Sequence, residues 1–361
     1  MPFEPNKILH RTQLQEIIQQ AMAEHGNDCD LNHLDVSRVR EMDELFKGIE
    51  FHGDISRWDV SNVTSMRQMF ENSTFNGDIS GWDVSNVTDM KGMFYQSKFD
   101  GDLSLWDTSN ALDMTGMFSE SVFNGDISRW DTSKVQDMSM LFYKSRFRGD
   151  LSRWDTSQVK CMTMMFMRSP FQGDISKWNV GQVNDMSHMF DKSYFNGDIS
   201  QWNVSNVFEM NLMFYRSRFN GDLSLWDTSN VTNMTGLFYE SPFNGDVSRW
   251  NTSKVQSMSH MFANCPFQGD LSDWDLRSLQ DYGGVFSEDH HSPLGYLHML
   301  QQDYCFLDKD PRAKPFLQAR QLCAQLGLNP LESAQYIYHA MGQTKQMVIP
   351  GLSDFSGATG P

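Results

Sequence analysis

Carboxylates recur at a fixed interval along most of this chain. Asp54 and Asp59 return every 24 residues, the second as either Asp or Asn, so stacked repeats would form two columns of polar side chains. Carboxylates about 5 Å apart repel each other unless each accepts hydrogen bonds or binds a cation. We therefore predict that both aspartates accept backbone N–H groups at turns. A ladder of calcium ions is the alternative interpretation, although the nonapeptide signature of calcium-binding β-rolls is absent.

A second set of reactive side chains follows the repeats. Histidine, cysteine and aspartate can bind metals or act as acids, bases and nucleophiles, but the spacings here match no standard motif. The chain also lacks the G-x-S-x-G, H-E-x-x-H, P-loop and dinucleotide-binding motifs. We therefore expect no catalytic site and no cofactor, with an enzyme in the C-terminal segment as the alternative. The set consists of Asp289, His290, His291, His298, Cys305, Cys323 and His339.

A third set combines aromatic and basic side chains in a very acidic protein. The formal net charge of −17 argues against nucleic-acid binding, which needs a basic surface. Tyr and Arg are side chains that often anchor protein interfaces. We predict that this set forms a stripe that binds a protein partner; the alternative is a solvated edge whose long side chains shield apolar residues. The stripe consists of Tyr95, Tyr143, Lys144, Arg146, Arg168, Lys192, Tyr215, Arg216 and Arg218.

The tryptophans indicate which elements position these side chains. All ten are spaced 24 residues apart, from Trp58 to Trp274. A fixed period of this length is typical of stacked supersecondary repeats that bury their apolar faces on each other. We therefore expect residues 31–286 to form a repeat solenoid of about eleven repeats, the first and last degenerate, in which matching indoles stack.

The reference repeat, Phe51–Thr74, predicts a local structure for each of its segments. Asn-Gly dipeptides and the glycine that recurs from Gly53 to Gly269 predict a turn with positive φ. Apolar residues within 55–60 have the spacing of a short strand, and those within 63–70 form one face of a short helix. Ser61-Asn62 would cap that helix, with acidic residues three positions later as in a capping box. The expected fold class is α/β, a leucine-rich-repeat-like solenoid with a short parallel strand and a short helix per repeat and helical caps at both ends.

The segments outside the repeats are predicted to be mainly helical. Residues 1–30 carry apolar side chains at helical spacing over Thr12–Glu24, so this helix should cap the N-terminal end. Residues 287–350 are expected to form a small helical region, with helices near Pro293–Asp303, Pro315–Leu326 and Pro330–Met341. Residues 351–361 are rich in Gly and Ser and are expected to be disordered.

The repeat resembles that of a known bacterial family. The pattern Phe-Asn-Gly-Asp-Ile-Ser-x-Trp-Asp-Val-Ser-Asn-Val-Thr-x-Met-x-x-Met-Phe is similar to the repeat of BspA-like bacterial surface proteins, a variant of the leucine-rich repeat. The resemblance covers about Leu31 to Phe286. It implies a solenoid used for adhesion or protein binding, with no shared catalytic residues.

Targeting signals and cysteines bear on where such a protein would act. The N-terminus shows no secretory signal, and no apolar run reaches the roughly 20 residues of a membrane span. The five cysteines are odd in number and include no C-x-x-C pair, which favours reduced thiols. We therefore expect a cytoplasmic chain, with non-classical export as the alternative.

The expected function is that of a non-catalytic protein–protein interaction scaffold, binding its partner along the solenoid surface. Two further alternatives stay open. One is an exported adhesin or host-directed effector. The other is a cytoplasmic inhibitor or immunity-type protein, for which an acidic surface would suit a basic toxin.

Overall fold

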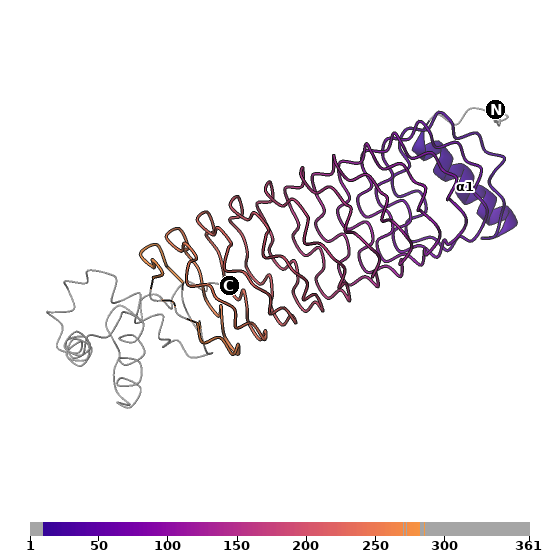
Figure 1. The fold of residues 1–361 in the computed structure, drawn as a ribbon. Coiled ribbons are helices and arrows are strands. Elements are labelled where there is room, and N and C mark those ends of the chain that lie inside the picture. Colours follow the sequence, from indigo (N-terminus) through magenta and orange to yellow (C-terminus); the bar gives the residue numbers. More distant parts are fainter. Residues whose placement is uncertain (1–9, 270, 272, 282–284, 286–361) are drawn as a thin grey trace, which may run out of the picture. The chain divides into compact units, whose positions relative to one another are not determined.

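The structure, a computed structural model, describes residues 10–269, 271, 273–281 and 285. The chain divides into two compact units, unit 1 of residues 1–203 and unit 2 of residues 204–361. Within the described residues there is one helix, α1, Arg11–His25, and no strand. The remaining described chain of each unit is a succession of turns. Each repeat forms one coil, and within a unit consecutive coils lie side by side (Figure 1).

The predicted α/β fold is therefore wrong, because no described repeat contains either a strand or a helix. Adjacent coils are joined instead by single-residue parallel bridges, such as Ser65 to Asp89 in unit 1 and Asn233 to Ser257 in unit 2. Asn62 caps no helix, since its side-chain amide donates to the carbonyl of Ser37 in the preceding coil at 2.9 Å.

In the segment that was predicted to be helical, backbone groups form hydrogen bonds to the next coil as well as within their own coil. The N–H groups of Met66, Gln68, Phe70 and Asn72 donate to carbonyl oxygens 23 residues later, at 2.9, 2.8, 2.8 and 2.7 Å. Two of the N–H groups between them close local turns, since Met69 donates to the carbonyl of Met66 and Glu71 to that of Gln68. An α-helix would direct all of these N–H groups to residues four positions earlier and leave none for the next coil.

Two backbone positions per coil make this pattern possible. The φ angle is 53° at Gln68 and 50° at Asn72, and the equivalent described residues of the other coils are also in the left-handed region. Glycine occupies the Gln68 position in some coils, such as Gly92 and Gly116, whereas others carry a full side chain, such as Met164 with a φ of 57°. A left-handed L-residue costs roughly 1–2 kcal/mol, so the inter-coil bonds and packing must offset this strain.

Stacked aromatic rings fill the interior of the coils. Trp58 and Trp82 are parallel within 4°, with ring centroids 6.4 Å apart, and Phe70 stacks on Phe94 at 5.6 Å. Trp226 and Trp250 stack in the same way in unit 2, at 6.3 Å. In unit 1 each indole N–H donates to a carbonyl 27 residues earlier, at 2.9–3.2 Å. The prediction that matching indoles stack from repeat to repeat is confirmed.

The recurring glycine has a different role from the one predicted. The described glycines with positive φ are Gly26, Gly48, Gly92, Gly116 and Gly236, so the glycine that recurs every 24 residues from Gly53 to Gly269 is not left-handed. These residues are glycines because a phenylalanine ring lies against their backbone, as Phe75 does at Gly77 and Phe99 at Gly101.

A Cβ atom at Gly125 would lie 2.9 Å from both Cε2 and Cζ of Phe123, closer than side-chain carbons approach. The preceding asparagine also serves the stack, since Asn124 Oδ1 accepts the N–H of Arg148 in the next coil at 2.7 Å. The Asn-Gly pair is thus a site of close packing and inter-coil bonding rather than a left-handed turn.

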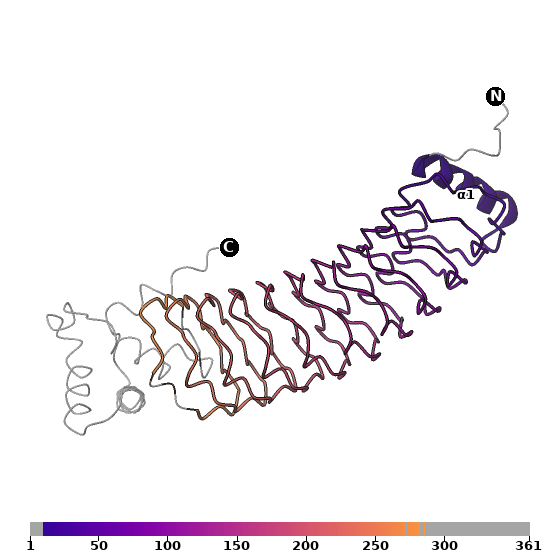
Figure 2. The same cartoon turned by 45° about the horizontal axis from the view of Figure 1, so that its top comes forward.

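The N-terminal helix expected over Thr12–Glu24 is present as α1, which lies across the first coils of unit 1 (Figure 2). Leu14 and Ile18 of α1 are completely buried, and Arg11 donates to the carbonyl of Asp43 at 2.7 Å. The helices and tail predicted for residues 287–361 lie outside the described residues, as do residues 1–9.

The close approach at Gly125 predicts a specific sensitivity to a methyl group. We expect Gly125→Ala to lower the free energy of unfolding by about 1–3 kcal/mol, because the methyl group would collide with the Phe123 ring. Gly81→Ala is the matched control, since a Cβ there meets no atom within 4 Å. Urea midpoints of the two variants and the wild type would test this, and equal midpoints for all three would contradict it.

Candidate functional site

The two recurring aspartates accept hydrogen bonds within their own coil, as predicted. Asp54 Oδ1 accepts the N–H of Ser56 at 2.9 Å, and Asp59 Oδ1 accepts that of Ser61 at 3.1 Å. Asn179, at the Asp59 position of a later coil, accepts the N–H of Gly181 at 3.1 Å. The role therefore needs an acceptor oxygen rather than a charge. Among the described residues, no group of three or more His, Cys, Asp or Glu is arranged to hold a metal ion.

Hydrogen bonding stabilises the ionised form of these carboxyls. The backbone N–H of Ser104, followed by its hydroxyl, lowers the pKa of Asp102 below its ordinary value. The same causes, from the serine two residues later, lower the pKa of most aspartates in this column. They do so at Asp54, Asp78, Asp126, Asp150, Asp174, Asp198 and Asp246.

The acidic residues predicted to complete capping boxes have no helix to cap. Asp89 Oδ1 instead accepts the N–H of Lys91 at 3.0 Å, and Asp113 Oδ1 accepts that of Thr115 at 2.8 Å. Burial raises the pKa of Asp89, and the neighbouring charge of Asp113 contributes in the same direction. The capping-box interpretation is therefore wrong, and the residues form a partly buried acidic column at the bridges between coils.

The unit 1 part of the predicted stripe lies mostly at the end of the inter-coil ladder, where the N–H groups of Lys144 and Arg168 donate to the next coil. Lys144 Nζ lies 4.8 Å from the ring centroid of Tyr143 and 3.2 Å from Glu120 Oε1 in the preceding coil. Arg146 and Arg168 are exposed and form no ion pair with another described residue. The other two members in this unit, Tyr95 and Lys192, are half-buried.

The unit 2 part of the stripe has the same kind of arrangement. Arg216 lies over the ring of Tyr215 at 5.3 Å and makes two hydrogen bonds to Glu240, at 2.6 and 2.7 Å. Tyr215 also stacks on Tyr239, with ring centroids 5.0 Å apart. Arg218 is exposed.

The glutamates that neutralise two of these cations were not among the predicted site residues. Glu120 and Glu240 stand at the same repeat position as Lys144 and Arg216, one coil before and one coil after, respectively. The sequence did contain a sign of these ion pairs, since residues of opposite charge stand 24 residues apart at this position. The stripe therefore combines aromatic rings, two paired cations and the exposed arginines Arg146, Arg168 and Arg218, instead of being uniformly basic.

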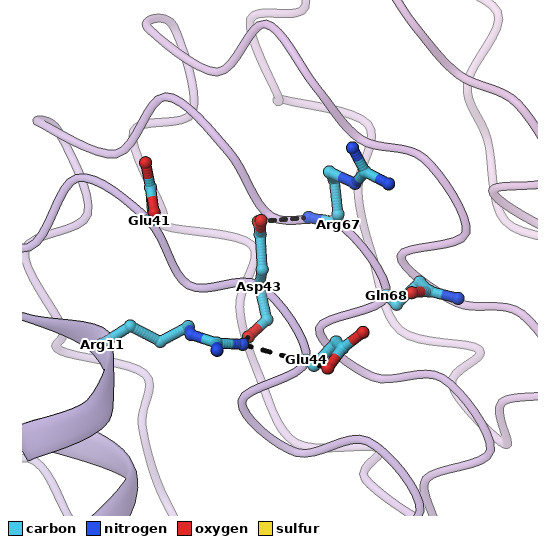
Figure 3. Close-up of a pocket in the computed structure, with 6 residues that line it drawn as sticks. All are labelled: Arg11, Glu41, Asp43, Glu44, Arg67 and Gln68. Atoms are coloured by element: carbon cyan, nitrogen blue, oxygen red, sulfur yellow. Dashed lines mark hydrogen bonds and ion pairs between the residues drawn. The ribbon is translucent and has the colours of Figure 1, made fainter.

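A polar cavity of about 280 Å³ lies beside α1 in unit 1, and the sequence analysis did not single it out (Figure 3). Arg11 Nη1 is 3.9 Å from Glu44 Oε2, and Asp43 Oδ1 accepts the N–H of Arg67 at 3.0 Å. Carboxylates and guanidinium groups thus largely compensate each other there. The cavity is lined by Arg11, Glu41, Asp43, Glu44, Arg67 and Gln68.

The position of Arg11 follows from the direction of the ladder. Because the ladder N–H groups donate to the following coil, the accepting carbonyls point back toward the preceding coil. In the first coil the carbonyl of Asp43 accepts from Arg11 instead, at 2.7 Å. The guanidinium therefore satisfies one carbonyl at the open end of the unit 1 ladder, as a cation can at a helix C-terminus.

The second set of reactive residues, Asp289 to His339, lies outside the described residues. Within the described part of the chain, no helix combines the length and the apolar character that a membrane span requires.

The chain matches the family model described as "Mycoplasma protein of unknown function, DUF285" in three segments, residues 12–123, 120–218 and 191–293. Together these segments cover more than half of the 361 residues. The chain therefore belongs to this family, a repeat family related to the BspA-like proteins. No curated protein and no solved structure matched the chain.

The lowered pKa of Asp102 predicts a loss of stability in acid. Its bonds to Ser104 contribute stability above the unfolded pKa of about 3.9, and this contribution is lost as the pH falls through the lowered folded-state pKa. We expect Asp102→Ala to be less stable than the wild type at pH 7 and the difference to shrink in acid. Asp102→Asn keeps an acceptor oxygen and should stay close to the wild type at pH 7. Urea midpoints measured from pH 7 to pH 2 would check this; a difference that does not change with pH would refute it.

The raised pKa of Asp89 predicts the opposite effect, namely that removing the charge stabilises the fold at pH 7. Its ionised form disfavours folding once the pH exceeds its raised pKa, so Asp89→Asn should be more stable than the wild type at pH 7. The gain should disappear as the pH falls through that pKa toward about 3.9. Asn233 shows that asparagine fits this position, where it accepts the N–H of Thr235 at 3.0 Å. The lost ion pair with Arg67, at 3.6 Å, is half-exposed and worth less than ~1 kcal/mol. Thermal unfolding at several pH values would measure the gain, and a less stable variant at pH 7 would count against the assignment.

Proposed function

We propose that this chain is a non-catalytic interaction protein of the BspA-like type, which binds a protein partner through its stripe residues, Tyr95 to Lys192 in unit 1 and Tyr215 to Arg218 in unit 2. The observation that supports this most is the division between constant and variable residues. The aspartate at the Asp54 position and the tryptophan at the Trp58 position are the same in every copy and use their polar groups within the stack. The stripe positions instead change from coil to coil, as in Tyr143 and Met167.

The side chains of the stripe have properties that suit an interface. Tyrosine and arginine offer large contact areas and several hydrogen bonds. Lys144 and Arg216 each lie over a tyrosine ring and form an ion pair with a glutamate. Because these side chains are already held in place, they would lose less entropy when a partner binds. Arg146 and Arg168 remain exposed for acidic groups of the partner.

Replacing the stripe on an otherwise intact chain would test this function. The variant Tyr143→Ala, Lys144→Ala, Arg168→Ala and Arg216→Ala removes three positive charges. Its matched control, Arg57→Ala, Arg153→Ala and Lys177→Ala, removes three exposed positive charges from another position of the coil. Recovery of partner proteins from the cells that make the chain would be quantified by mass spectrometry, after thermal melts have shown that both variants fold.

The stripe variant is expected to lose its specific partner by about 10-fold or more, as for removal of several interface anchors, and the control is expected to retain it. Equal recovery with the wild type, the stripe variant and the control would contradict the proposed function of the stripe.

A further inference from the structure

The same exposed leucine occurs once in each unit. The ten residues Gly101–Asn110 return unchanged as Gly221–Asn230. In this segment Leu105 is 79% exposed and Leu225 is 63% exposed. The other eight copies carry Arg, Lys, Gln, Gly or Asp at this position. One exposed leucine needs no explanation, but its return in the same surroundings suggests a shared role.

The coil after each leucine presents the same arginine. Arg129 follows Leu105 by one repeat, and Arg249 follows Leu225 in the same way. The backbones of adjacent bridged coils are about 5 Å apart. The Cα atom of each arginine therefore lies next to that of the leucine in the preceding coil. Both arginines are exposed, and neither forms an ion pair with another described residue.

Each of the coils that carry these arginines also carries a lysine, and the two lysines are held in the same way. Lys134 Nζ donates to Asn110 Oδ1 at 2.7 Å, and Lys254 Nζ donates to Asn230 Oδ1 at 2.6 Å. Among the ten repeats, these are the two copies with a cation at the Asn62 position.

The asparagines are fixed in turn. Asn110 donates to the carbonyl of Ser85 at 2.8 Å, and Asn230 donates to that of Ser205 at 2.7 Å. Each ammonium group is thus anchored through one of its three N–H bonds. Asp107 lies close to the ammonium group of Lys134, since hydrogen bonds from Ser109 and then the charge of Lys134 lower the pKa of Asp107.

We propose that each unit carries one copy of the same peptide-binding site, formed by Leu105, Arg129 and Lys134 in unit 1 and by Leu225, Arg249 and Lys254 in unit 2. The ligand is a polypeptide segment with an apolar side chain next to a carboxylate. The apolar side chain covers the leucine, and the carboxylate accepts hydrogen bonds from the guanidinium and ammonium groups.

The surroundings favour a peptide over a nucleic acid. Exposed aspartates stand on both sides of each leucine, Asp102 and Asp107 in unit 1 and Asp222 and Asp227 in unit 2. These aspartates would repel the continuous row of phosphates in a nucleic acid. They would repel a single peptide carboxylate less, because the two cations of the site neutralise its charge. The leucine also offers an apolar contact that a phosphate backbone cannot use.

These sites do not share residues with the stripe, so the two proposals can fail separately. The experiment begins with a phage-displayed library of random 12-residue peptides selected on the full chain. Enriched peptides are then titrated calorimetrically against the wild type, Leu105→Gln, Leu225→Gln and the double variant. Glutamine is native at this position as Gln201, so it is compatible with the fold. Arg153→Gln, at the same position of a coil outside both sites, is the control.

We expect enriched peptides to contain an apolar residue beside Asp or Glu and to bind twice per chain. Each single leucine variant should weaken one site by about 10-fold or more and leave the other unchanged, and the double variant should weaken both. The control should keep both sites. One binding event per wild-type chain, loss of both sites in a single variant, enriched peptides without a carboxylate, or no enrichment at all would overturn the proposal.

Discussion

Within each unit, the arrangement of the described coils depends on a row of backbone hydrogen bonds that all run in the same direction. Between the Met66 and Asn72 positions, every second N–H group donates to the next coil, and the groups at the Met69 and Glu71 positions close turns within the coil. This alternation requires left-handed backbone at two positions per coil. It also sets the spacing at which rings such as Trp58 and Trp82 stack. Hydrogen bonds and ring packing therefore support each other, and one coil alone would have neither.

This use of the backbone separates residues that hold the stack from residues that are free to vary. Recurring aspartates, asparagines and tryptophans use their polar atoms on their own or adjacent coils, as Asp54, Asn62 and Trp58 do. Side chains that differ from coil to coil, such as Leu105 and Arg168, are exposed. A stack of this kind can change its surface locally without changing its interior, which suits recognition of partners better than a single chemical centre.

The sequence predicted the period, the buried rings and the acceptor role of the aspartates, because these follow from spacing and from the Asp-x-Ser pattern. It did not predict the secondary structure, because apolar residues spaced three apart fit successive turns as well as a helix. Residues such as Met164 and Lys144 give no sign of the left-handed backbone that they adopt. The glycines at the Gln68 position, Gly92 and Gly116, were the sequence feature that indicated a left-handed backbone there. The ion pairs of the stripe could not be predicted from local sequence, because partners such as Glu120 and Lys144 are 24 residues apart and become neighbours only when the coils stack.

The sign of φ at Met140 and Met164 tests this account most directly, and it can be measured by solution NMR from backbone chemical shifts and short-range NOEs. The account predicts positive φ at both residues, with the Met140 N–H bonded to the carbonyl of Thr163 one coil away. Negative φ at both residues, with N–H groups bonded four residues back as in an α-helix, would contradict it and restore the helix that the apolar spacing suggested.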